Sequence, residues 1–160
     1  MNLPWTICFI RHADRVLMQY RRKPPNQNCW NGVGGHIEPG ETPLQCILRE
    51  IAEETGIHLT TARFAGLVTG FYGDREMYAF LADLPGDCDP SDIESSDGWL
   101  AWIPQQYLHD EPEIVSNIPH FLPPMLAGEE PAEYHCTYGD DGNLISVEVR
   151  PLTVDLEGVA

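Results

Sequence analysis

A glycine-rich turn followed by a well-marked helix constrains this chain more than any other stretch. The turn reads GGHIEPGE at residues 34–41, and Thr42 after it is a favoured helix N-cap. Pro43 suits the first helical position, and Gln45 completes a Thr-x-x-Gln capping box. Gly56 suits the position just past a helix end. The sequence therefore predicts a loop that leads into a helix of defined length.

Two faces of this predicted helix differ in chemistry. The apolar face has the i, i+3, i+4, i+7 spacing of a buried stripe and consists of Leu44, Ile47, Leu48, Ile51 and Thr55. Glu50, Glu53 and Glu54 share a second face, roughly 120° away. Like charges at this spacing destabilise a helix by about 0.2–0.5 kcal/mol per pair. A solvated acidic face is the ordinary interpretation of such a run alone, whereas a divalent cation would relieve the repulsion.

The spacing of the run extends back into the glycine-rich turn. Gly35 is followed after five residues by Glu41, and then after seven residues by REIAEETGI at 49–57. Residues 35–57 thereby resemble the Nudix box, which is Gly, five residues, Glu, seven residues, Arg-Glu-aliphatic-any-Glu-Glu-any-Gly-aliphatic. Every constrained position matches, so the chain resembles a Nudix hydrolase.

This resemblance implies a fold and a reaction class. The implied fold is an α/β class Nudix α/β/α sandwich with a mixed β-sheet. The implied reaction is hydrolysis of a nucleoside diphosphate linked to a further group. A single domain over residues 1–160 is expected, because this length can bury one core and no internal repeat is present.

The resemblance also assigns a divalent metal, Mg²⁺ or alternatively Mn²⁺, to the loop and the helix. The implied ligands are the Gly34 carbonyl and the carboxylates of Glu50, Glu53 and Glu54. Nudix enzymes often add a carboxylate from the loop before a Trp-x-x-hydrophobic strand, which here is WLAWIP at 99–104. Asp97 is best placed to supply it, and Glu94 is the alternative.

Catalytic roles follow from the same resemblance. Arg49 is implied to orient the carboxylates through charge-assisted hydrogen bonds, although helical spacing points it to one side of them. Glu41 is implied to support the helix start or a water on the metal. Glu53 is the expected general base, since a carboxylate beside a metal can take a proton from water, with Glu54 and Asp97 as rivals.

The residues before the box bear on the substrate. WNG at 30–32 resembles the MutT-type branch of oxidised-purine nucleoside triphosphatases, in which the Asn matching Asn31 hydrogen-bonds the base. An Asn-Gly pair is equally typical of a turn. That branch carries adjacent acidic base-binding residues at the start of its last helix, whereas this chain has Asn117, which can still donate and accept hydrogen bonds.

The implied reaction is conversion of a nucleoside triphosphate to monophosphate and pyrophosphate, with oxidised purines such as 8-oxo-dGTP as substrates. Alternatives are a nucleotide sugar, ADP-ribose, a dinucleoside polyphosphate, or a non-catalytic module that senses nucleotides. Further substrate contacts are expected from Arg21 or Lys23 to phosphate and from Phe71 by stacking on the base. Solvated charge and hydrophobic packing are the respective alternatives.

The remaining pattern predicts short strands and a last helix. The expected strands are 5–10, 16–22, one within 58–69, 77–82, 99–104, 134–138 and 144–149, with a helical turn at 105–109. A last helix is expected over 112–126, started or interrupted by Pro119 and by Pro123 and Pro124. The clearest hairpin joins 134–138 to 144–149 through a Gly- and Asp-rich turn.

Charge and cysteine usage limit the partners and the compartment. The net charge of −16 argues against binding a nucleic acid polymer, so a small nucleotide is the expected partner. No apolar run has membrane-spanning length, and residues 1–5 do not resemble a signal peptide. The five cysteines are scattered, which disfavours zinc and disulfide frameworks and indicates reduced thiols in the cytoplasm. No signal for oligomeric state is present.

Overall fold

A mixed β-sheet organises the chain in the computed structural model, which describes residues 4–21, 28–71, 75–93, 98–109 and 113–160. The strands are β1 (Trp5–His12), β2 (Arg15–Arg21), β3 (Cys29–Asn31), β4 (Arg63–Phe71), β5 (Arg75–Asp83), β6 (Gly98–Pro104), β7 (Ala132–Tyr138) and β8 (Leu144–Arg150). The helices are α1 (Pro43–Thr55) and α2 (Ile118–Leu126), with single 3₁₀ turns η1 (Pro90–Asp92), η2 (Gln105–Tyr107) and η3 (Leu156–Gly158).

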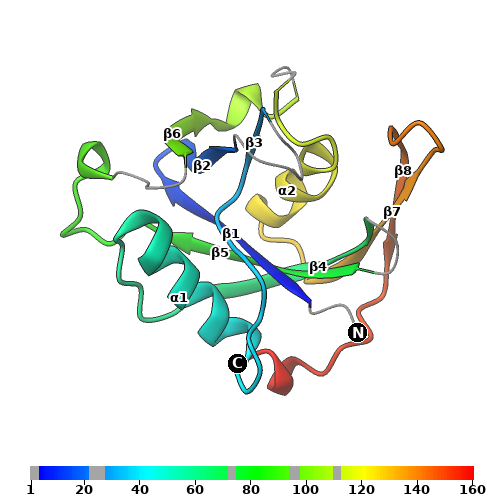
Figure 1. The fold of residues 1–160 in the computed structure, drawn as a ribbon, viewed down its shortest axis with the longest axis horizontal. Coiled ribbons are helices and arrows are strands. Elements are labelled where there is room, and N and C mark those ends of the chain that lie inside the picture. Colours follow the sequence, from blue (N-terminus) through cyan, green and yellow to red (C-terminus); the bar gives the residue numbers. More distant parts are fainter. Residues whose placement is uncertain (1–3, 22–27, 72–74, 94–97, 110–112) are drawn as a thin grey trace.

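The order of strands is β3-β2-β1-β5-β4-β7-β8, and β6 pairs with β2. β1 and β5 run parallel, as do β4 and β7, whereas the other pairs are antiparallel. Helices α1 and α2 lie on opposite sides of the central strands (Figure 1). The expected α/β/α sandwich with a mixed sheet is therefore confirmed.

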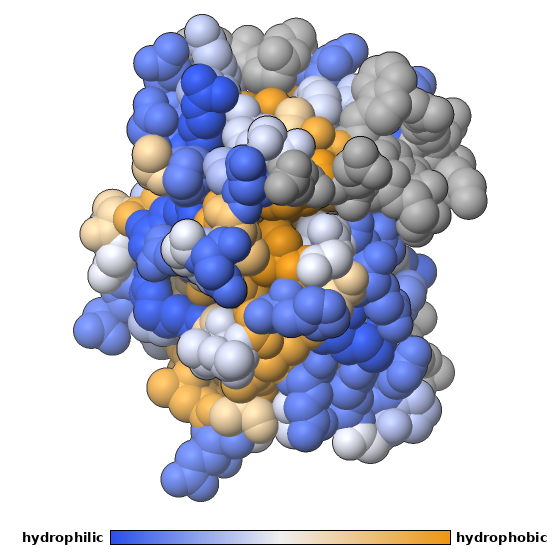
Figure 2. All heavy atoms as spheres, turned by 90° about the vertical axis from the view of Figure 1, so that its left-hand side faces the viewer, coloured by the Kyte–Doolittle hydropathy of each residue, from blue (hydrophilic) through white to orange (hydrophobic). Residues whose placement is uncertain are grey.

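Two buried hydrophobic clusters fill the layers on either side of the sheet. The α2 layer includes a chain of aromatic contacts, in which the Phe9 and Phe121 ring centroids lie 6.1 Å apart and those of Phe121 and Tyr134 lie 6.3 Å apart. The α1 layer includes Ile47 and Ile51 of the helix. On the left-hand side of Figure 1, apolar atoms reach the surface in a central strip bordered by hydrophilic residues (Figure 2).

The predicted strands are present, with boundaries that move by a few residues. The last helix, predicted over 112–126 and started or interrupted by Pro119, is α2 and begins at Ile118. Residues before it are held by Trp30 instead, whose N–H donates to the Glu113 carbonyl and whose carbonyl accepts from the Val115 N–H. Pro119 lies in the first turn of α2, where a missing N–H leaves no helical bond unmade.

Residues 151–160 lead from β8 back to the start of α1 (Figure 1). The Val159 carbonyl accepts a 2.9 Å hydrogen bond from the Leu44 N–H, and the Val159 side chain is buried in the α1 layer. The first N–H groups of a helix have no partner within the helix. This segment therefore completes the first turn of α1. Among the described residues, no helix is long and apolar enough to cross a membrane.

The ends of α1 follow the predicted caps. The Thr42 side chain accepts from the Gln45 N–H, and the Gln45 side chain accepts from the Thr42 N–H, which completes the capping box. Gly56 is left-handed at φ 77°, and its N–H donates to the Ala52 carbonyl. The helix that carries the acidic residues thus has both ends fixed by local interactions.

We expect Gly56→Ala to lower the free energy of unfolding by about 1 kcal/mol, because an L side chain is strained at this backbone angle. Gly86→Ala is the matched control: both glycines have open space around a built Cβ, but only Gly56 has a positive φ. The control should change stability by less than about 0.5 kcal/mol in urea denaturation. Equal losses in the two variants would contradict this explanation.

Candidate active site

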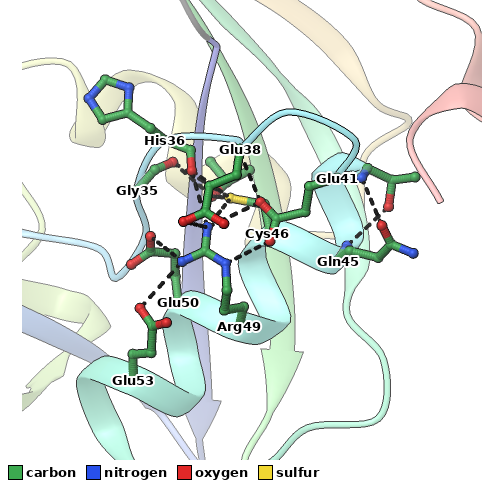
Figure 3. A network of polar contacts seen from close by, with 11 residues as sticks. Gly35, His36, Glu38, Glu41, Gln45, Cys46, Arg49, Glu50 and Glu53 are labelled. Carbon is green, nitrogen blue, oxygen red and sulfur yellow. Dashed lines mark hydrogen bonds and ion pairs between the residues drawn. The ribbon is translucent and has the colours of Figure 1, made fainter.

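The guanidinium of Arg49 lies at the centre of a network of carboxylates on α1 and the preceding loop (Figure 3). Its Nε and Nη2 donate to the two oxygens of Glu41 at 2.6 and 3.1 Å. Its Nη1 donates to Glu50 Oε1 at 3.0 Å and to Glu53 Oε2 at 3.3 Å. The prediction that Arg49 points to one side is wrong, because its long side chain reaches back to these groups. One arginine thereby fixes three of the carboxylates in the motif.

The network shifts the acidity of its members in opposite directions. The hydrogen bond from Arg49 holds the pKa of Glu41 below its ordinary value, and the bond to Glu41 raises the pKa of Arg49. Burial raises the pKa of Glu50 in spite of the bond from Arg49, and the Glu50 side chain is only 14% exposed. Glu53 differs, since its side chain is 58% exposed. Water therefore has access to Glu53 more readily than to Glu50.

The two glycines of the loop are required by close packing. A Cβ at Gly34 would collide with the Thr6 carbonyl of β1, and a Cβ at Gly35 would collide with the Glu50 carboxylate. Thr6 also holds this loop directly, because its N–H and its hydroxyl both donate to the Gly35 carbonyl, at 2.8 and 3.1 Å. The loop backbone is therefore pressed between β1 and the carboxylate of α1.

The side chain of Glu54 is oriented by a residue of a strand, β2. Gln19 of β2 is 7% exposed, and its Nε2 donates to Glu54 Oε2 at 3.1 Å. Sequence reasoning did not identify Gln19 as a site residue. The alternation along residues 16–21 placed Gln19 on the same side as Leu17, and burial of Leu17 in the α1 layer is the signal that points Gln19 toward the helix.

The carboxylates present oxygen donors that suit a hard divalent cation. Glu50 and Glu53 each direct one oxygen to the same nitrogen of Arg49, so both already face a single positive charge. Within the ranges that the structure describes, no three His, Cys, Asp or Glu side chains form a ready group for an ion. The predicted loop ligand, Asp97 or Glu94, lies outside the described residues. The donor chemistry fits the expected metal, because Glu50 packs against Gly35, the neighbour of Gly34, and shares α1 with Glu53 and Glu54.

A cavity of about 610 Å³ opens on the α2 side of the sheet. Four of the five predicted substrate residues line it, namely Arg21, Asn31, Phe71 and Asn117, and Lys23 lies outside the described residues. A cavity of this size is in the range that holds small ligands. The fold therefore brings together residues from β2, β3, β4 and the turn before α2.

The polar side chains of the cavity are already oriented. Asn31 Oδ1 accepts from the Gly32 N–H at 2.9 Å, and Asn31 also lines the cavity. The same side chain therefore contributes to the turn and to the cavity wall. Asn117 is 5% exposed, and its Nδ2 lies 3.9 Å from Cys136 Sγ. Phe71 is also buried, at 8% exposed. Both amide side chains therefore lie in a largely apolar cavity wall, where a few placed polar groups can determine which ligand binds.

Trp5 connects the cavity to the glycine loop. It lines the cavity, and its ring centroid lies 3.9 Å from that of His36, which directly follows Gly35. The Arg75 Cζ atom lies 5.4 Å from the centroid of the Trp5 ring. Neither Trp5 nor Arg75 was predicted as a site residue, because only the pairing of β1 with β5 brings them together.

Comparison with known proteins places these features in context. The family described as NUDIX domain matches residues 2–123. An uncharacterized Nudix hydrolase of Bacillus subtilis, YvcI, is 29% identical over 159 residues, covering 91% of this chain and 93% of that protein. The NAD-capped RNA hydrolase NudC of Vibrio parahaemolyticus is 34% identical over 95 residues, covering 59% of this chain and 36% of that protein.

The fold also matches a solved structure. The MutT protein from Bacillus halodurans superposes with a TM-score of 0.76 at 22% identity, covering 95% of this chain and all of that one. At this identity the likeness concerns the fold.

We expect Arg49→Gln to lower the free energy of unfolding by about 2 kcal/mol, because partly buried carboxylates lose their charged donor. Arg150→Gln is the matched control, since Arg150 also lies near two carboxylates but is exposed. The control should change stability by less than about 0.5 kcal/mol. Chemical denaturation checks both values. Similar losses of stability in the two variants would show that Arg49 stabilises the fold no more than an exposed arginine does.

Proposed function

This chain belongs to the Nudix family of hydrolases, which act on phosphoric anhydride bonds, and we propose that its substrates are nucleoside triphosphates. The proposed products are a nucleoside monophosphate and pyrophosphate. Oxidised purine nucleotides, such as 8-oxo-dGTP, are the proposed preferred substrates. The observation that supports this proposal is the contact of Trp5, which lines the cavity, with His36, whose carbonyl accepts from Arg49 of the carboxylate network.

The proposed cofactor is Mg²⁺, held by the Gly34 carbonyl and by Glu50, Glu53 and Glu54. When bound, such an ion neutralises phosphate charge and activates the attacking water. The contacts of Arg49 with Glu50 and Glu53 support this set, because they keep both carboxylates on one side of the helix.

Glu53 is the proposed general base. Its side chain is exposed enough for water to approach, and its bond to Arg49 fixes its direction. Glu54 is held by Gln19, which suits a ligand that stays in place, and remains the rival for this role. Glu41 is proposed to support the site indirectly, because both of its oxygens hold Arg49.

Asn31 and Asn117 are the proposed readers of the base. With its oxygen engaged by Gly32, Asn31 is left to offer its amide N–H groups to an acceptor on the base. Asn117 provides a second amide in the same cavity, and Phe71 provides an aromatic wall. These contacts support a purine that presents both donors and acceptors, as an oxidised purine does.

A second candidate is hydrolysis of a small pyrophosphate such as the dinucleotide NAD or the nucleotide sugar ADP-ribose. The likeness to NudC over 95 residues favours it, although the matched part is 36% of that protein. The net charge of −16 disfavours an RNA polymer as substrate, because phosphate contacts dominate such binding. Both compounds therefore belong in any substrate test.

The first experiment is pyrophosphate release with Mg²⁺ across a nucleotide panel. The panel contains the four dNTPs, 8-oxo-dGTP, 2-oxo-dATP, ADP-ribose, NAD and a dinucleoside tetraphosphate. We expect a preference of at least about 100-fold in kcat/KM for an oxidised purine over its normal counterpart. Phosphorus NMR identifies the products. Turnover of ADP-ribose, NAD or the tetraphosphate alone would discard the proposed substrate and keep the hydrolase chemistry.

We expect Glu53→Gln to lower kcat by about 100-fold or more, because the amide cannot accept a proton from water. Glu130→Gln is the control, since Glu130 is an exposed carboxylate after α2 and its loss changes the net charge equally. Thermal unfolding of both variants should match the unchanged protein. Normal turnover in Glu53→Gln would assign the base to another residue, with Glu54→Gln as the next variant to measure.

A further inference from the structure

We propose that Arg75 binds the phosphate groups of the substrate between the cavity and the carboxylate network. This inference rests on the proposed function, because it assumes a substrate that spans both places. Arg75 lies outside the Nudix box, and sequence reasoning gave it no role. Its position on β5 against Trp5 is the observation that carries the inference.

The sheet directs Arg75 toward the cavity. Trp5 pairs with Met77 in the parallel register of β1 and β5, and both residues line the cavity. Arg75 lies two residues before Met77, so its side chain leaves the same face of the strand. Its guanidinium lies 5.4 Å from the centroid of the Trp5 ring. Arg75 therefore lies near the mouth of the cavity on the side of Trp5.

The same indole reaches the catalytic loop. The His36 ring lies 3.9 Å from Trp5, and His36 adjoins Gly35, which packs against the Glu50 carboxylate. Trp5 both lines the cavity and contacts His36, so a nucleotide with its base in the cavity and its anhydride bond near Glu50 is expected to pass along Trp5. Its phosphates would then lie near the Arg75 guanidinium, 5.4 Å from the centroid of that ring.

The negative charge of the chain makes a cation beside Trp5 important for phosphate binding. The chain carries a net charge of −16, and the carboxylates of the motif repel a polyphosphate. In the described part of the chain, Arg21 lines the cavity and Arg75 lies over Trp5.

The chemistry of the side chain fits the task. A guanidinium is planar, stays charged and matches two phosphate oxygens with parallel N–H groups. A cation–π contact with the indole holds the guanidinium near the ring, so less freedom is lost when the phosphate binds. The quantity to measure is therefore the affinity for phosphate groups, separately from the affinity for the base.

The test compares Arg75→Gln with Arg15→Gln. Arg15 is exposed at the hairpin end of β2, so its loss changes the net charge equally without touching Trp5. The probe is inorganic tripolyphosphate with Mg²⁺, titrated calorimetrically, together with the KM and kcat of the preferred triphosphate. We expect Arg75→Gln to raise the tripolyphosphate Kd and the KM roughly tenfold, with kcat changed much less. Arg15→Gln should change both by less than about twofold.

Two further measurements separate phosphate binding from a structural or base-binding role. Arg75→Lys keeps the charge and should recover part of the lost affinity for tripolyphosphate. The matching nucleoside, which lacks phosphates, should inhibit Arg75→Gln and the unchanged protein equally.

Three outcomes would overturn the inference: equal losses in both glutamine variants, weaker nucleoside binding with unchanged tripolyphosphate binding, or no tripolyphosphate binding by the unchanged protein. Failure of the proposed function would give a different result. In that case tripolyphosphate binds and depends on Arg75, but no nucleoside triphosphate is hydrolysed.

Discussion

The bond pattern of Arg49 is the interaction on which the site depends. Its guanidinium joins Glu41 at the end of the glycine loop to Glu50 and Glu53 on α1, and a bond to the His36 carbonyl adds the loop backbone. One positive charge thereby offsets part of the repulsion among the carboxylates gathered on this patch. The loop and the helix are held as one unit, because the same cation serves both.

Local interactions explain which parts of the fold are predictable from sequence. The capping box of Thr42 and the left-handed Gly56 act within a few residues, so the bounds of α1 are correct. The hairpin of β7 and β8 is correct for the same reason. The sequence leaves the start of α2 open between residue 112 and Pro119, because the contacts of Trp30 that hold residues 113–115 outside the helix have no local signal. The parallel pairing of β4 with β7 likewise has no local signal.

The same distinction holds for the site. Spacing along one helix and its preceding loop predicts Glu41, Arg49 and the three later glutamates of the motif, and the resemblance adds the Gly34 carbonyl. Gln19 and Trp5 lie against these residues only through strands that meet across the sheet, so no pattern within their own segments distinguishes them. The resemblance implies the bonds of Arg49 to the carboxylates, whereas helical spacing alone does not, because it fixes where a long side chain begins but not where it ends.

The contact between Val159 and Leu44 has a consequence for the order of folding. The N–H group at the start of α1 finds its partner in a residue from the far end of the sequence, so the contact closes a long loop. Such contacts form late in folding, because closing a long loop costs conformational entropy before the contact can stabilise the chain. On the ribosome, the Leu44 N–H at the start of α1 therefore gains this partner only after residues 151–160 have emerged.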